Sequence, residues 1–170
     1  MATEREVDRL RAEVDSTIAG DPWYGSSVLK ILDGVDSVDA LAHQAPDSHS
    51  IWELVLHITA WTKETTRRLK GGRHDVPVEG DWPRVAGADA ASWARVVAEL
   101  RRAHGELSRT LAELEDSQLD RQVADEQVDA HGQPITFRRT VIGLLQHDAY
   151  HAGQVALLKK LRGAKLERSA

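Results

Sequence analysis

The sequence contains no cysteine among its 170 residues. The chain therefore forms no disulfide and supplies no thiolate of its own. Any metal that it binds must be held by nitrogen and oxygen atoms. Chemistry that depends on a thiol would need one from a separate small molecule.

Long apolar runs are also missing. No stretch reaches the ~18 apolar residues of a membrane-spanning helix, and the charged segment 1–16 lacks the apolar centre of a secretory signal. We therefore expect a cytoplasmic protein with no membrane partner. The net charge of −5 is unlike the basic balance of a general nucleic-acid binder, so no nucleic-acid partner is expected.

Several catalytic motifs are absent from the sequence, namely a glycine-rich phosphate loop, a GxSxG elbow and an HExxH helix. No linker rich in proline, glycine or serine divides the chain. Apolar residues make up 41% of it, enough for a core that needs neither metal nor disulfide. We therefore predict one domain over residues 1–170.

Apolar residues recur at helical spacing along most of the chain, and this periodicity predicts amphipathic helices. Together they predict an all-α fold, a four-helix bundle with short extra helices. The short helices are expected at about 26–33 and just after Asp36 or Ser37. The four long helices are expected at about 3–19, 50–70, 89–115 and 136–162.

Local signals mark the ends of the expected helices. Ser50 followed by Glu53 is a capping-box pattern, and Gly71 with Gly72 ends that helix. Thr136 is expected to begin the last helix and Gly163 to end it.

Two longer connections are expected between the helices. Residues 73–88 should cross the surface, held to the body by Trp82. Residues 117–135 are expected to be irregular, with a short extended piece at 122–128.

Three histidines lie on the expected helices. His147 and His151 are four residues apart, so they share one helix face, and His57 lies on the second long helix. Such a set can form a tripod around a divalent metal. The alternative is three half-buried histidines, each with its own hydrogen bond. One shared metal would offset the desolvation of all three, where separate hydrogen bonds need three partners.

Neutral imidazoles without cysteine suit zinc, nickel, iron(II) or copper(II). Three protein ligands leave positions for water or substrate, which is typical of a catalytic site. Nearby groups are candidates to orient the imidazoles or line a pocket, with ordinary packing or solvation as the alternative for each. These candidates are Glu53, Asp148, Tyr150, Gln154, His49 and Trp23.

Three blocks of the sequence carry a resemblance to a known family. They are GDPWYGSS at 20–27, HSIWELVLHITAW at 49–61 and QHDAYHAGQVALLKK at 146–160. In order and spacing the chain resembles the DinB-like (DinB/YfiT) superfamily of metalloproteins. The middle, about 73–135, contributes little to the likeness.

The resemblance implies an up-down-down-up bundle with a three-histidine metal site between the second and fourth long helices. The ligand positions fall on His57, His147 and His151. Zinc or nickel is the first expectation, with iron, manganese or copper as alternatives. Asp148 stands where an asparagine would be expected. Members are often dimers, so a homodimer is implied here.

Some relatives are thiol-dependent S-transferases or isomerases that use bacillithiol, mycothiol or glutathione. A metal-dependent transferase acting on a small molecule with a low-molecular-weight thiol is therefore the first functional hypothesis. A metal-dependent hydrolase and a non-catalytic metal-binding stress-response protein are alternatives. A metal-free interaction module is a further one.

Overall fold

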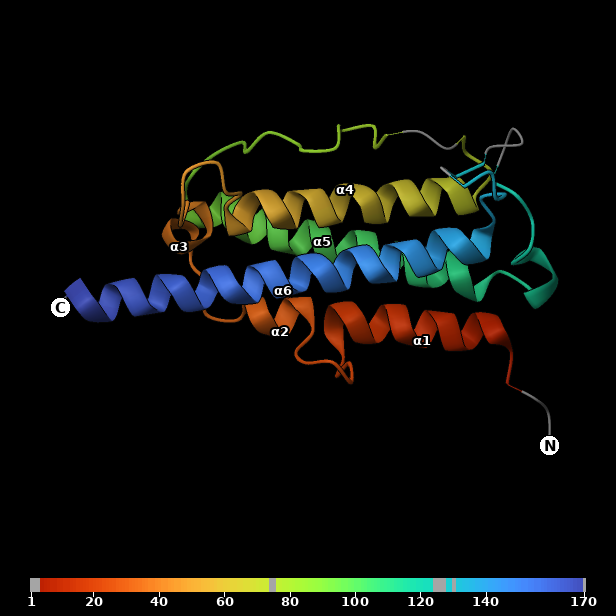
Figure 1. The fold of residues 1–170 in the computed structure, drawn as a ribbon, viewed down its shortest axis with the longest axis horizontal. Helices are drawn as coiled ribbons and strands as arrows, with labels where there is room; N and C mark the ends of the chain where they lie inside the picture. The colour runs from red at the N-terminus through yellow and green to blue at the C-terminus, as the bar shows by residue number, and fades with distance from the viewer. Residues whose placement is uncertain (1–3, 74–75, 124–127, 130, 170) are drawn as a thin grey trace.

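The long helices form an up-down-down-up bundle in a computed structural model that describes residues 4–73, 76–123, 128–129 and 131–169. In Figure 1, two of these helices run one way, α1 (Glu6–Ala19) and α6 (Phe137–Ser169), and two run the other way, α4 (Ile51–Leu69) and α5 (Ala90–Ala112). Short helices α2 (Val28–Leu32) and α3 (Ser37–Leu41) complete the predicted set, and a 3-10 turn covers Asp116–Gln118. The predicted all-α fold is confirmed.

The capping box at the start of α4 is confirmed. Ser50 Oγ accepts a hydrogen bond from the Glu53 backbone N–H at 3.2 Å, and Glu53 Oε2 accepts one from the Ser50 N–H at 2.8 Å. The helix ends at Leu69, and Gly71 follows with φ 89°. A residue without Cβ adopts that left-handed conformation at little cost.

The start of α6 is also as predicted, because Thr136 Oγ1 accepts a hydrogen bond from the Arg139 N–H at 3.2 Å. The predicted end at Gly163 is wrong, since the helix continues to Ser169 and projects beyond the other long helices (Figure 1). One glycine costs a helix only ~1 kcal/mol relative to alanine, and no proline follows to stop it.

The apolar faces of the helices meet in two clusters. One contains Trp52, Ile58, Leu100 and Val155, and the other contains Leu107, Leu111, Phe137 and Val141. Because α4 packs against both α5 and α6, its side chains face the interior over most of its length.

The connection between α4 and α5 runs back along the outer side of α4 (Figure 1), which makes these two helices parallel. The Trp61 indole N–H donates to Asp81 Oδ1 at 2.8 Å, and Lys63 pairs with Glu79 at 2.8 Å. The predicted role of Trp82 is confirmed, because its ring stacks on His49 and on His57. This connection therefore lies over the part of α4 that carries His57.

The irregular segment before α6 contains two isolated bridges, Gln122 to Thr136 and Val128 to Pro134. They agree with the ends of the extended piece predicted at 122–128, whose residues 124–127 lie outside the described part. Among the helices that the structure describes, none is both long and apolar enough to cross a membrane.

Candidate metal centre

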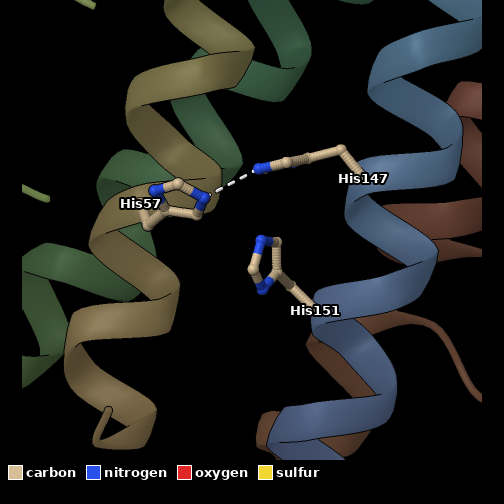
Figure 2. Close-up of side chains that lie close together, drawn as sticks. All are labelled: His57, His147 and His151. Atoms are coloured by element: carbon tan, nitrogen blue, oxygen red, sulfur yellow. Dashed lines mark hydrogen bonds between the residues drawn. The ribbon is translucent and has the colours of Figure 1, made fainter. Parts of the chain in front are cut away.

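Three imidazoles meet between α4 and α6. His57 comes from α4, while His147 and His151 come from successive turns of α6, and Figure 2 shows the rings pointing toward one another. One nitrogen from each ring lies within 4.8 Å of the others. His57 Nε2 and His147 Nε2 are 2.8 Å apart. The structure thus brings together the three residues that the sequence singled out.

Each imidazole is held through its other nitrogen. His57 Nδ1 donates to the Asp81 backbone carbonyl at 2.6 Å. His151 Nδ1 donates to Gln154 Oε1 at 2.6 Å, and His147 Nδ1 lies 3.0 Å from Asp148 Oδ1. A neutral imidazole carries one proton, so an acceptor at Nδ1 leaves Nε2 with a bare lone pair.

Burial opposes the addition of further protons to this cluster. It is the main cause that lowers the pKa of His57, and it lowers the pKa of His151 to about 4. The neighbouring imidazoles act in the same direction. His57 and His151 are therefore mainly neutral at pH 7. The facing Nε2 atoms of His57 and His147 repel one another wherever both carry lone pairs, unless a proton or a metal cation lies between them.

The donor set fits a divalent ion on chemical grounds. Imidazole nitrogens bind zinc at about 2.0–2.1 Å, which holds tetrahedral ligands about 3.3 Å apart. The spacings here, from 2.8 Å to at most 4.8 Å, bracket that value. A hydrogen bond to the remote nitrogen of each imidazole is also the usual support of a metal-binding histidine. The buried group His57, His147 and His151 could thus hold a metal ion.

Asp148 lies behind the site, with only 3% of its surface exposed. Burial raises its pKa, and the interaction with His147 opposes that rise. Its carboxylate accepts from the Nδ1 of His147, so it sets the tautomer of that ring. Of the sequence candidates, Asp148 and Gln154 contact the imidazoles in this way.

Trp82 forms one wall of the site by lying between two histidines. Its ring is stacked 3.9 Å from the His57 ring at an interplanar angle of 8°, and 3.5 Å from the His49 ring at 6°. His49, a sequence candidate, therefore reaches the site through Trp82. The contacts of Asp81 and Trp82 with His57 could not be predicted from the sequence, because both residues lie in an irregular connection without periodicity.

The remaining candidates have other contacts. Glu53 closes the capping box and lies 3.7 Å from His49 Nδ1. Tyr150 places its ring 5.0 Å from that of His151 but is 65% exposed. Trp23, a candidate to line a pocket, is 92% exposed and has its ring against Tyr24. It follows α1 in a turn on the outside of the bundle.

A hollow of about 300 Å³ begins at His147 and follows the groove between α4 and α6. Trp61, Leu144 and Ile135 supply apolar walls, and Arg68 and Arg139 supply charge. The His147 side chain is 24% exposed, against 6% for His57. The imidazole cluster is therefore more open on the side where this hollow lies.

Comparison with known families agrees with this arrangement. The sequence profile described as the DinB superfamily matches residues 25–155. The chain belongs to the DinB superfamily. The matched range contains all three histidines, so the family's implied metal site and the geometry concern the same residues.

A solved structure supports the fold of this DinB-superfamily chain. The crystal structure of a conserved protein from Enterococcus faecalis superposes with a TM-score of 0.71 at 16% sequence identity. The match covers 94% of this chain and 98% of the other. At that identity the likeness concerns the fold alone. No curated protein matches the sequence.

Proposed function

We propose that this protein binds one divalent metal ion through the Nε2 atoms of His57, His147 and His151 and serves as a thiol-dependent transferase acting on a small molecule. The observation that supports the metal is the set of three Nδ1 hydrogen bonds, which leaves three lone pairs directed at one point. Zinc or nickel is expected first, because neutral imidazoles suit both. Iron, manganese and copper are alternatives.

A divalent ion bound there would lower the pKa of a thiol or of a water molecule, so that a nucleophile exists at neutral pH. The chain contains no cysteine, so the thiol would come from a low-molecular-weight co-substrate. A hydrolase that activates water is the alternative reaction.

The residues around the histidines have separate roles in this proposal. The Asp81 carbonyl, Asp148 and Gln154 fix the ring orientations, so the donor atoms need little rearrangement. Trp82 covers His57 and keeps water from that side. The hollow beside His147 would receive the second reactant.

The first test is metal analysis of protein purified without a polyhistidine tag. We expect about one divalent ion per chain, and its loss in the double variant His57→Ala with His151→Ala. His104→Ala is the matched control, because this histidine lies on α5 and pairs with Asp15 at 3.3 Å. Metal-free protein, or full metal content in the double variant, would refute the site.

The second test asks whether a thiol binds at the metal. Thermal shifts are measured with glutathione, bacillithiol and mycothiol, each compared with its S-methyl derivative. A metal-dependent shift with a free thiol alone supports the transferase. Metal at full stoichiometry with no thiol shift would reject the transferase and leave the hydrolase or a non-catalytic metal-binding role.

A further inference from the structure

The hollow next to His147 has an uneven distribution of charge. Among the lining residues that the structure describes, two are positively charged, Arg68 and Arg139, and one is negatively charged, Asp129. Arg68 is buried and is hydrogen-bonded through Nε to Glu64 at 2.7 Å. Arg139, by contrast, is 47% exposed at the mouth of the hollow. A ligand with a negative group is favoured there over a neutral or positive one.

Arg139 has a partner that an incoming anion can replace. Its guanidinium pairs with Asp129 Oδ2. Asp129 is held separately, because its Oδ1 accepts the N–H groups of His131 at 2.8 Å and Gln133 at 2.9 Å. A half-exposed arginine can therefore turn to a ligand carboxylate while the turn around Asp129 keeps its hydrogen bonds.

Most of the remaining wall is apolar, with Thr65 and Thr140 as polar exceptions, and it contains an unfilled position. Trp61 from α4 and Leu144 from α6 form its walls. A Cβ built on Gly143 meets no atom within 4 Å, so this glycine leaves space where another residue would place a side chain. Gly143 and His147 are one turn apart, and Arg139 is one turn further, which spaces the arginine from the histidine by about 12 Å along the helix.

We propose that this hollow is the substrate pocket and that it takes a small carboxylic acid with an apolar body, whose carboxylate binds Arg139 and whose body lies against Trp61 over Gly143. The other end of such a molecule then lies at His147. The inference rests on the proposed function only where it places the far end of the ligand beside a metal at His147. The recognition of the carboxylate depends on Arg139 whether or not a metal is bound.

The probes are 4-phenylbutanoate and the neutral 4-phenylbutanamide, which differ only in the charged group. Their dissociation constants are measured by NMR titration with protein as purified and again after chelation. We expect the acid to bind at least about tenfold more tightly than the amide, because the neutral amide can still accept one hydrogen bond but cannot form the charge-assisted pair with the guanidinium.

Variants assign that preference to particular residues. Arg139→Gln should reduce the acid-to-amide preference to below about twofold and leave amide binding unchanged. Asp129→Asn should strengthen acid binding, since the competing carboxylate disappears while Oδ1 still accepts the two N–H groups. Gly143→Leu should weaken both probes by filling the pocket. Gly105→Leu on α5, another open glycine, should change neither.

Several results would overturn the inference. They are equal binding of acid and amide, binding of neither, an acid preference that survives Arg139→Gln, or wild-type affinity in Gly143→Leu. A preference that persists in Arg139→Gln but disappears on chelation would place the carboxylate on the metal, which supports the proposed function and refutes the arginine. If the protein holds no metal but the acid preference depends on Arg139, the arginine is supported and the proposed function is refuted.

Discussion

Replacing Glu64 with glutamine should destabilise the protein strongly at neutral pH. Glu64 is 2% exposed and accepts three hydrogen bonds from guanidinium groups, two from Arg67 at 2.7 and 2.8 Å and one from Arg68 at 2.7 Å. Arg68 is buried as well and lies 5.4 Å from the Trp61 ring centroid. The variant removes the negative charge from this cluster while the buried guanidinium stays.

The expected loss is about 3–5 kcal/mol in the free energy of unfolding, as when one partner of a buried ion pair is removed. For a chain of this size that corresponds to a fall in melting temperature of about 6–20 °C. The assay is urea unfolding followed by circular dichroism, with thermal melts beside it. Glu106→Gln is the control, because its pair with Lys70 is exposed and such pairs contribute about 0–1 kcal/mol.

The stability difference between wild type and Glu64→Gln should also depend on pH. Burial alone would raise the pKa of Glu64, but the hydrogen bonds from Arg67 and Arg68 outweigh it and keep the pKa below its ordinary value of 4.5. The carboxylate therefore adds stability that is complete above about pH 5 and is lost as the pH falls through the lowered pKa. The stability gap between wild type and Glu64→Gln should therefore narrow as the pH falls. A gap below about 1 kcal/mol at pH 7, or one that stays constant to pH 3, would refute the reasoning.

Further predictions concern the metal site and the core. Gln154→Leu should weaken metal binding about 10–100-fold in a chelator competition, while Gln146→Leu on an exposed position of the same helix should not. Chelation should lower the melting temperature of metal-loaded wild type by about 5–10 °C and leave His57→Ala unchanged, since the ion joins two helices; equal shifts in both would contradict a bridging ion. Leu100→Ala should cost about 2–5 kcal/mol, whereas exposed Leu157→Ala should cost little.

The homodimer stays a prediction from the family resemblance. Light scattering coupled to size exclusion measures the mass of the particle directly. A mass of 18.8 kDa, that of one chain, would reject it.

The helices could be predicted because their signals are local. The Ser50–Glu53 capping box needs contacts only between residues three apart, and the apolar spacing repeats within each helix. The end of a helix is harder to predict, because a local stop signal competes with the helix-forming residues around it. Gly163 is a weak stop that the flanking helix-forming residues outweigh, so α6 runs on to Ser169.

The position of His147 and His151 on one helix face could also be predicted from local spacing, since residues four apart share a face of any helix. That His57 meets them was a hypothesis from the residue types and helical positions, which the family resemblance supported, and it depends on α4 packing beside α6. Trp23 shows the limit of such reasoning, because an aromatic residue in a turn gives no local sign of whether it faces the core or solvent.

The sequence by itself thus determined the number of long helices, their apolar faces, the absence of thiolate ligands and the two histidines on one face of α6. Only the tertiary structure decided what surrounds them. The Asp81 carbonyl on His57, the Trp82 ring between His49 and His57, and the hollow beside His147 all come from segments far apart in the chain. Such contacts depend on how the helices pack and where the α4–α5 connection lies, and neither has a periodic signature in the sequence.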